Sequence, residues 1–501
     1  MNPKKAKITN SIVPASKAFL GLDLGTGGAR LLAADETGRV LAESRADYPS
    51  PVAGMPADRH EQDPLDWWLA TVEAGRKLAT DLLQKGHRLE DIAGLAVDGT
   101  SGTIACVDAA GEPLRPAIMY NDGRAAESAA AVNAVAADHC AKLGYRFDAS
   151  FAISKLLWMQ KFEPEVLEKT THVCHHADFI IGRLTGDFSI SDYSNALKTG
   201  YDLLDDDWPV WMDHFADVRE RLPRVVPPGT VIGRISPAAA GELSLPAHIP
   251  VVSGASDGTA GCLASGIQKP GDANTTLGTT LIFKVLSPGI ALHPDGTVYS
   301  HKLPGDCWLP GAASNTGGQW IQRHYQNSAL QAMDDQAARR LPNSHVAYPL
   351  ARTGERFPFL IPNAEGFCEP EPLMDVDRYA ACLQGTAFVE RLCYEILDDV
   401  TGSPGGDVFA TGGGSRSDVW LQCRADVTGR VYHRPQAPEA AHGAAVLAAT
   451  GTHFEDLWAA IRNMVHMDRS VAPDPVRKEN YNDLYGRFRD ELRRRKYLPE
   501  L

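Results

Sequence analysis

Two short glycine-rich segments carry residue types that can bind phosphate groups. The first is Asp23-Leu24-Gly25-Thr26, and the second is Leu277-Gly278-Thr279-Thr280. Short apolar runs flank both segments, which predicts a strand, a tight turn and a second strand in each case. Such turns point successive backbone N–H groups outward, and a threonine hydroxyl follows each glycine. Two turns of this kind could hold a polyphosphate from opposite sides, so the sequence indicates nucleotide chemistry.

Two aspartates are candidates for the chemistry itself. Asp23 stands at the mouth of the first turn, where its carboxylate would repel phosphates unless a cation such as Mg²⁺ lay between them. Asp257 follows the apolar run at residues 249–252, and a carboxylate at the end of a strand can accept the proton of a substrate hydroxyl. Purely local roles are open for both: Asp23 could cap its own turn, and Asp257 could cap a helix that begins at Gly258.

The pentapeptide at residues 254–258, Gly-Ala-Ser-Asp-Gly, allows a rival chemistry. It fits the G-x-S-x-G nucleophile turn of α/β hydrolases, with Ser256 as the nucleophile. That alternative needs an acid and a histidine further along the chain, such as Asp407 with His433 or His442, and it gives neither glycine-rich turn a function. A sensor that binds a sugar or nucleotide without turnover is a third class, which the two aspartates disfavour.

Three other polar segments could contribute to binding. Residues 98–103 (DGTSGT) connect two short apolar runs and could bind a polyol. Residues 411–417 place three glycines between a strand and a helix, where a phosphate or a planar ligand could approach the backbone. Residues 172–176 (HVCHH) have metal-ligating types but lack partners at the spacing of structural zinc sites, so no zinc site is predicted.

Length and composition limit the classes of protein to which this chain can belong. A chain of 501 residues exceeds what one hydrophobic core usually supports, so two large domains are expected. The formal net charge of −14 argues against a general partner of nucleic acids or anionic membranes. No apolar run approaches the roughly 20 residues that span a bilayer. The nine cysteines lack C-x-x-C spacing and indicate a reducing, cytoplasmic environment.

Short apolar runs alternate with helical stretches along the chain, which favours an α/β architecture with covered sheets. We expect strands at residues 19–22, 31–34, 40–44, 95–97, 103–107, 251–252 and 408–410. We expect helices at residues 64–83, 154–161, 178–183 and 377–401, and the start of a further helix near residues 417–418. Asp63 would be the N-cap of the first helix, and a glycine would end the third. The repeated Leu-Gly-Thr suggests a duplicated fold.

In their order along the chain, these motifs resemble those of the FGGY carbohydrate kinases, a family that shares its fold with actin and the heat-shock-type ATPases. The resemblance covers about residues 19–451. The matching segments are the two glycine-rich turns, Ser154-Lys155-Leu156-Leu157-Trp158, Arg183-Leu184-Thr185-Gly186, residues 254–257, Gly354-Glu355-Arg356 and Thr411-Gly412-Gly413-Gly414. Within the family the sequence is most similar to D-ribulose kinases, on residues 98–101, 191–198, 298–303 and 313–318, whereas Asn121-Asp122-Gly123-Arg124 is similar to the pattern of xylulose kinases.

The resemblance implies two duplicated, ribonuclease H-like α/β domains around a central cleft. Residues 18–266 would hold the sugar and residues 267–455 the nucleotide, with a flexible extension at 1–17 and a helical extension at 456–501. The basic stretch at 483–496 would pack on the first domain or remain solvated. The implied reaction is ATP-dependent phosphorylation of a ketopentose at its C5 hydroxyl, D-ribulose or alternatively D-xylulose, by an enzyme for which a homodimer is a possible assembly.

Roles for single residues also follow from the resemblance. Asp257 matches the catalytic base, and Asp23 matches the carboxylate near Mg²⁺ and the sugar. The other implied sugar-binding positions are Gly27, Gly28, Ala29, Arg30 and Ser101. The implied ATP-binding positions are Thr26, Gly278, Thr279, Ala312, Gly413, Gly414, Ser415, Arg416 and Ser417.

Overall fold

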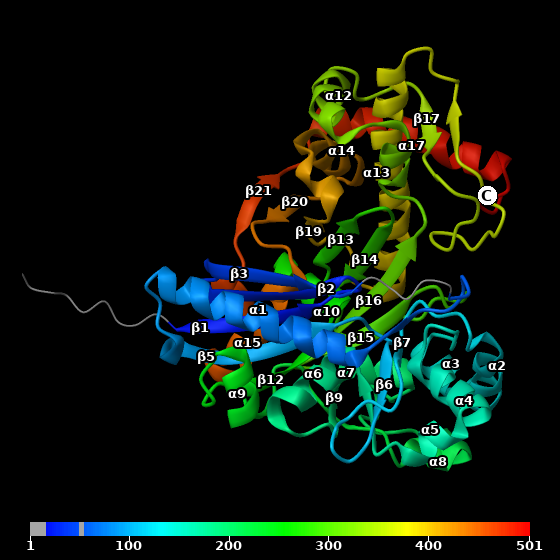
Figure 1. The fold of residues 1–501 in the computed structure, drawn as a ribbon. Coiled ribbons are helices and arrows are strands. Elements are labelled where there is room, and N and C mark those ends of the chain that lie inside the picture. The colour runs from blue at the N-terminus through cyan, green and yellow to red at the C-terminus, as the bar shows by residue number, and fades with distance from the viewer. Residues whose placement is uncertain (1–16, 50–54, 501) are drawn as a thin grey trace, which may run out of the picture.

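The computed structural model describes residues 17–49 and 55–500, in two halves that each centre on a mixed sheet (Figure 1). The expected extension at residues 1–17 therefore lies outside the described residues, apart from Lys17. Within the described ranges, no helix is long and apolar enough to cross a bilayer.

The first sheet has the strand order β11-β12-β5-β1-β2-β3. Its strands are β1 (Ala18–Leu24), β2 (Gly28–Asp35), β3 (Val40–Asp47), β5 (Ile92–Gly99), β11 (Val231–Arg234) and β12 (Pro250–Ser256). The three central strands β12, β5 and β1 are parallel, and the hairpin β1–β2 continues into the antiparallel β3. Each expected strand of this sheet is present and extends beyond its predicted limits.

The second sheet has the order β15-β16-β14-β13-β19-β20-β21. Its strands are β13 (Ala273–Leu277), β14 (Leu281–Val285), β15 (Tyr299–Leu303), β16 (Cys307–Ser314), β19 (Val408–Thr411), β20 (Tyr432–Pro435) and β21 (Met467–Val471). From β16 to β20 the order and the parallel or antiparallel sense of every pair repeat those from β3 to β12 of the first sheet. An antiparallel edge strand then completes each sheet, but β11 precedes β12 in the chain whereas β21 follows β20. The expected duplication is confirmed, with β15 as an additional edge strand.

Helix α15 (Ala440–Thr452) joins the two halves. It follows β20 in the chain but packs against β1 and β5 of the first sheet, beside α10 (Asp257–Ser265). Gly21 permits this contact, because a Cβ atom there would lie 1.8 Å from the carbonyl oxygen of Ala441. The resulting buried cluster contains side chains from both sheets, such as Phe19 and Phe409, so the floor of the space between the halves is part of the hydrophobic core.

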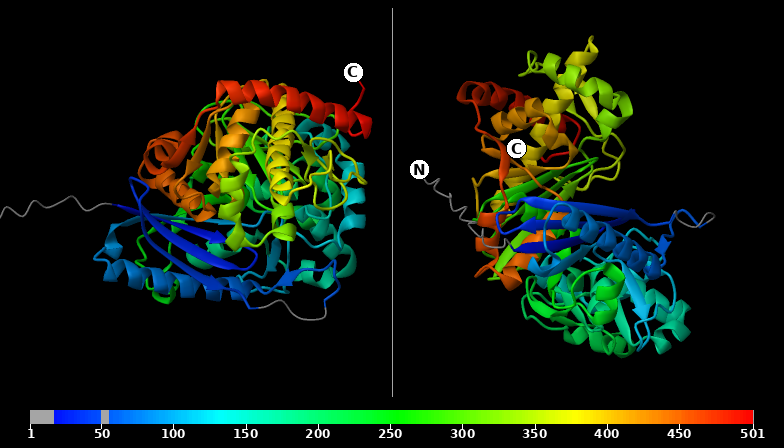
Figure 2. Two further views of the ribbon diagram at one scale, coloured as in Figure 1. Left: turned by 90° about the horizontal axis from the view of Figure 1, so that it is seen from above. Right: turned by 60° about the vertical axis from the view of Figure 1, so that its left-hand side comes forward.

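The outer faces of the sheets are covered by longer helices. Helix α1 (Pro64–Gln84) packs on β2 and β3, and the side chain of Asp63 caps it as expected. Helices α13 (Asp375–Thr401) and α14 (Asp418–Thr428) belong to the second half. The basic helix α17 (Pro475–Arg494) buries Tyr481, Tyr485, Phe488 and Leu492 in that same core. It therefore packs on the second half, neither on the first domain nor free in solvent (Figure 2).

The remaining elements form small sheets and helices around these layers. The strands are β4 (Glu61–Gln62), β6 (Ile104–Val107), β7 (Ala117–Ile118), β8 (His172–His175), β9 (Ile190–Asp192), β10 (Arg224–Val226), β17 (Val346–Tyr348) and β18 (Phe367–Glu369). The helices are α2 (Ala126–Val135), α3 (Ala137–Leu143), α4 (Ala152–Phe162), α5 (Pro164–Lys169), α6 (His176–Thr185), α7 (Tyr193–Ala196), α8 (Ala216–Arg219), α9 (Pro237–Leu243), α11 (Gln319–His324), α12 (Leu330–Ala337) and α16 (Leu457–Met464).

Candidate active site

Three carboxyl groups meet at one edge of the first sheet. Asp23 lies near the end of β1, Asp98 near the end of β5, and Asp257 directly after β12. Asp23 and Asp98 are register partners across the parallel pair β1–β5. Because the carboxyl ends of parallel strands lie at the same edge, these residues come together from distant parts of the chain. The edge is therefore acidic and faces the space between the halves.

Burial sets the protonation of these groups. It raises the pKa of Asp98 well above its ordinary value, and the charges of Asp23 and Asp257 add to the effect. Burial also raises the pKa of Asp23, against the opposing effects of Asp98 and Arg30. For Asp257, burial raises the pKa to about 6, although the Gly258 N–H donates a 2.6 Å hydrogen bond to Oδ1 and lowers it. A carboxylate with a pKa near the operating pH is suited to accept a proton.

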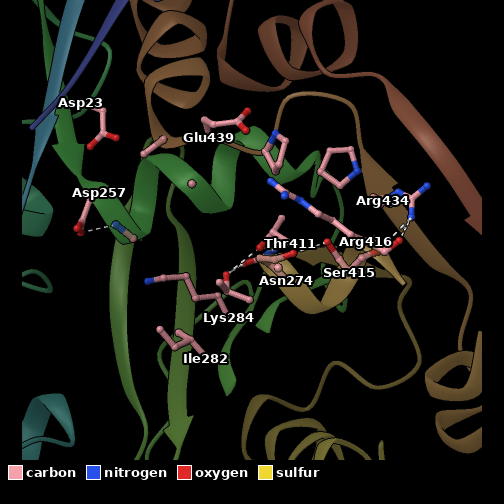
Figure 3. Close-up of a pocket in the computed structure, with 18 of the residues that line it drawn as sticks. Asp23, Asp257, Asn274, Ile282, Lys284, Thr411, Ser415, Arg416, Arg434 and Glu439 are labelled. Atoms are coloured by element: carbon pink, nitrogen blue, oxygen red, sulfur yellow. Dashed lines mark hydrogen bonds between the residues drawn. The ribbon is translucent and has the colours of Figure 1, made fainter. Parts of the chain in front are cut away.

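A first cavity of about 1100 Å³ opens between the two halves (Figure 3). Asp23, Gly25, Asp257, Gly258 and Gly261 line its first-half side. The second half contributes Asn274, Thr276, Ile282, Lys284, Thr411, Gly412, Gly413, Ser415, Arg416, Arg434, Pro435, Gln436, Pro438, Glu439, Ala440 and Asp468. This volume is large enough for a nucleotide.

A second cavity of about 680 Å³ adjoins the first. Polar and aromatic side chains line it, among them Thr100, Ser101, Tyr120, Lys198 and Tyr299. Four residues line both cavities: Asp257, Gly258, Ile282 and Lys284. Ligands bound in the two cavities would therefore meet beside Asp257.

The duplicated strands carry different residues at matching positions. Asp23 precedes the first Leu-Gly-Thr and Thr276 precedes the second, and their register partners are Asp98 and Thr411. The two threonine hydroxyls share a hydrogen bond of 2.8 Å. A polyphosphate would meet carboxyl groups at the first edge and neutral hydroxyls at the second. The second edge therefore lacks the negative charge that would repel a polyphosphate.

The two glycine turns close on themselves. The Gly25 N–H donates to the Gly28 carbonyl at 3.1 Å, and the Gly278 N–H donates to the Thr280 carbonyl at 3.0 Å. These two donors point inward, so the expectation that successive N–H groups all point outward is wrong for both glycines. Gly25 lines the first cavity, whereas Thr26, Gly278 and Thr279 lie outside both linings.

Residues 411–417 curl rather than lie flat. Gly412 has φ +81°, residues Gly413–Arg416 form a short 3₁₀ turn, and the Ser417 side chain caps α14 by accepting from the Trp420 N–H at 3.1 Å. Gly413, Ser415 and Arg416 line the first cavity as predicted. Gly414 instead packs toward Leu277, where an added Cβ would lie 2.5 Å from Cδ2, and neither Gly414 nor Ser417 lines the cavity.

The residues expected to bind the sugar are not all together. Ser101 lines the second cavity, and its buried hydroxyl has no hydrogen-bonding partner among the described residues. Residues 27–30 lie outside both linings, and the Arg30 guanidinium pairs with Glu43 at 3.1 Å. Ala312, expected beside the nucleotide, lines the second cavity.

Lys284 lines both cavities but was not among the predicted site residues, although a lysine within the apolar strand β14 was a visible signal.

The groups required by the hydrolase alternative do not meet. The Ser256 hydroxyl is 3.0 Å from the Thr259 hydroxyl and is buried. His433 does pair with Asp407 at 3.1 Å, but its other ring nitrogen contacts Ser470. Within the described residues, neither His433 nor His442 bonds Ser256, so no triad is formed.

The histidine-rich run at residues 172–176 is used in buried hydrogen bonds. His175 contacts Asp178 at 2.6 Å and Thr199 at 2.7 Å. His176 Nδ1 is 3.0 Å from the Thr100 hydroxyl, and burial lowers the pKa of His176 to about 3. His176 is therefore neutral and anchors the segment that carries Ser101. In the part of the chain that the structure describes, no cluster of three or more His, Cys, Asp or Glu is placed to hold a metal ion.

Comparisons of the sequence and the fold with known proteins identify the family to which the chain is similar. Models of the N-terminal and C-terminal domains of the FGGY family of carbohydrate kinases match residues 18–264 and 273–452. A xylulose kinase of Escherichia coli (strain K12) is 28% identical over 94% of this chain and 98% of its own, and an autoinducer-2 kinase of Klebsiella pneumoniae is 26% identical over 94% and 92%. The crystal structure of xylulose kinase from Rhodospirillum rubrum superposes with a TM-score of 0.83 at 27% identity, over 95% of this chain and 98% of its own.

Proposed function

Because the chain belongs to the FGGY family of carbohydrate kinases and is an ATP-dependent sugar kinase, we propose that it phosphorylates a ketopentose at the C5 hydroxyl, with D-ribulose as the preferred acceptor. The observation that carries the proposal is the position of Asp257 where the two cavities meet. The unpartnered hydroxyl of Ser101 in the second cavity is free to bind a sugar hydroxyl. The choice of D-ribulose rests on the resemblance of residues 98–101 to D-ribulose kinases. D-xylulose is the second candidate, since relatives along the whole chain are xylulose kinases.

In the proposed reaction, ATP occupies the first cavity, with its phosphates toward Thr411–Ser415, and the sugar occupies the second. The C5 oxygen attacks the γ-phosphorus, the bond from that phosphorus to the β–γ bridging oxygen breaks, and ADP leaves. Asp257 accepts the hydroxyl proton as the new bond forms. Positioning both ligands against one carboxylate turns a bimolecular encounter into a single oriented complex.

Asp23 is the proposed ligand for Mg²⁺. Burial raises the pKa values of both Asp23 and Asp98, and the charge of Asp23 raises that of Asp98 further, so a divalent cation beside these carboxyl groups would offset their mutual repulsion and fits the residues present. When bound, Mg²⁺ would supply neutralisation of the negative charge on the phosphates. We also propose the division of labour between residues 18–266 for the sugar and 267–455 for the nucleotide, and a cytoplasmic site of action, which the nine free thiols suit.

A coupled assay of ADP release tests the proposal across D-ribulose, D-xylulose, L-ribulose and related polyols. The expected result is the highest kcat/KM with D-ribulose, and a Ser101→Ala variant whose KM rises for the sugar but not for ATP. A wide preference for D-xylulose would overturn the choice of D-ribulose. Retention of full activity by Asp257→Ala would overturn the assignment of the base.

A further inference from the structure

Lys284 carries a buried charge at the point where the two cavities meet. It lies on β14, only 7% of its surface is exposed, and it lines both cavities. Its aliphatic chain passes two glycines: a Cβ atom would lie 3.5 Å from Cγ at Gly311 and 3.9 Å from Cε at Gly258. Figure 3 shows the side chain extending from its strand toward the side on which Asp257 lies. Both distances are those of ordinary van der Waals contact, so the lysine chain packs directly along these two backbone positions.

The ammonium group is only partly satisfied. Among the described residues, its hydrogen-bonding partner is Nδ1 of His301 at 3.2 Å, and it has no carboxylate within ion-pair distance. Burial, together with the charges of Lys284 and Lys198, lowers the pKa of His301 well below its ordinary value. The imidazole is therefore neutral, and its Nδ1 accepts one of the three ammonium protons. The other two donors remain for a ligand.

A second cation, Lys198, acts on the same His301 and Tyr299 side chains and lines the second cavity. This place therefore favours an anion despite the nearby Asp257. Besides His301, the Lys284 ammonium interacts electrostatically with Asp257, whose pKa it lowers, and with Tyr299. A buried ammonium with a single neutral acceptor is costly unless a negative group completes its surroundings. The reaction brings such a group to this position, because the phosphoryl group must pass from the first cavity to the second.

We propose that Lys284 is a catalytic residue that binds the phosphoryl group during transfer, with His301 as the positioning residue that aims its ammonium. The proposal rests on the proposed function, in which ATP and sugar occupy the two cavities. Lys284 donates hydrogen bonds to oxygens of the γ-phosphoryl group while it leaves ADP and keeps them as the group joins the sugar oxygen. Negative charge on those oxygens is thereby stabilised by a buried ammonium group.

The test compares Lys284→Met and Lys284→Arg with Lys302→Met. Lys302 is a matched control, since it is 6% exposed on β15 of the same sheet but pairs with Asp206 at 2.7 Å outside both cavities. Removal of one such donor typically costs about 100-fold or more in kcat. We expect that loss in Lys284→Met with KM for ATP changed less than threefold, partial recovery in Lys284→Arg, and activity within about threefold of the wild type in Lys302→Met.

Slow hydrolysis of ATP by the enzyme without sugar separates this proposal from the choice of sugar. The same group passes to water in that reaction, so Lys284→Met should lose hydrolysis in parallel with sugar phosphorylation, whichever sugar the wild type prefers. Retention of kcat within threefold, or a rise of the sugar KM alone with normal hydrolysis, would overturn the proposal. If Lys284→Met does not fold, His301→Asn decides: a kcat lowered about tenfold at unchanged sugar KM supports the proposal, and an unchanged kcat overturns it.

Discussion

Replacement of Asp257 by Asn should stabilise the protein while it abolishes phosphoryl transfer. Asparagine keeps the oxygen that accepts the 2.6 Å hydrogen bond from the Gly258 N–H, but it carries no charge. Burial raises the pKa of Asp257 from 3.8 to about 6, so the folded state disfavours the ionised carboxylate. The same charge that the reaction needs therefore weakens the fold.

The size and pH dependence of the effect follow from the pKa. The rise of the Asp257 pKa from 3.8 to about 6 lowers the free energy of unfolding by at most about 3 kcal/mol, since a tenfold change in proton affinity corresponds to about 1.36 kcal/mol. Below about pH 4 the Asp257 carboxyl is largely protonated in both the folded and the unfolded protein, so its burial costs no stability. As the pH rises from about 4 to 6, the unfolded chain releases the proton before the folded protein does, and the wild-type stability falls. Above pH 6 the loss is complete, so the advantage of Asp257→Asn is largest there.

Urea denaturation at pH 4.5 and pH 7.5 measures the difference in the free energy of unfolding between the wild type and Asp257→Asn. Asp483→Asn, an exposed carboxyl on α17, is the control and should change the free energy of unfolding by less than about 0.5 kcal/mol at either pH. A stability gain for Asp257→Asn that is the same at both pH values, or a loss at pH 7.5, would refute the reasoning that links burial of this charge to catalysis.

Three further outcomes are expected. In the coupled assay, the wild-type kcat/KM should fall about tenfold per unit below pH 6, as Asp257 takes up a proton. Gly317→Ala would place a Cβ 2.6 Å from the Thr279 carbonyl oxygen and displace the second glycine turn, so KM for ATP should rise severalfold, whereas Gly289→Ala, with open space around it, should leave KM unchanged. Glu390→Gln breaks the buried ion pair with Arg424, whose two hydrogen bonds measure 2.6 and 2.8 Å. Urea titrations should show a free energy of unfolding that is lower by about 3 to 5 kcal/mol. The control, Glu73→Gln in the exposed pair with Lys77, should lower it by less than about 1 kcal/mol.

The parts of the fold that local chemistry determines were predictable from the sequence. Glycine turns between apolar runs gave both hairpins, and the Asp63-Pro64 signal gave the start of α1. Helix α15 was not predicted, because it is buried among both sheets and apolar on all sides, so it lacks an amphipathic period. The packing of α17 was readable in principle, since Tyr481, Tyr485, Phe488 and Leu492 follow helical spacing despite the surrounding arginines.

The site was predictable only where a residue's own neighbours reveal its role. Asp23 and Asp257 stand at strand ends beside glycines, and both line the first cavity. Asp98 stands in an equally polar segment, but its place beside Asp23 depends on strand register, which no single segment contains. Lys284 comes close to Asp257 only through the packing of the two halves, which brings β14 beside Gly258. Tertiary contacts of this kind explain why the sequence identified the reaction class more readily than the full set of residues around it.

The two halves share a duplicated hairpin, so the residues that differ at matching positions show how their binding edges differ. Both contain the same hairpin and the same Leu-Gly-Thr turn, so the turn alone cannot decide which ligand each half binds. The residue pair that precedes the turns does differ: carboxyls at Asp23 and Asp98 in one half, hydroxyls at Thr276 and Thr411 in the other. Carboxyl groups suit a cation and sugar hydroxyls, whereas threonines accept a polyphosphate without repulsion. Divergence at these two matching positions therefore makes the two edges of one repeated scaffold chemically unlike, with Asp257 and Lys284 between them.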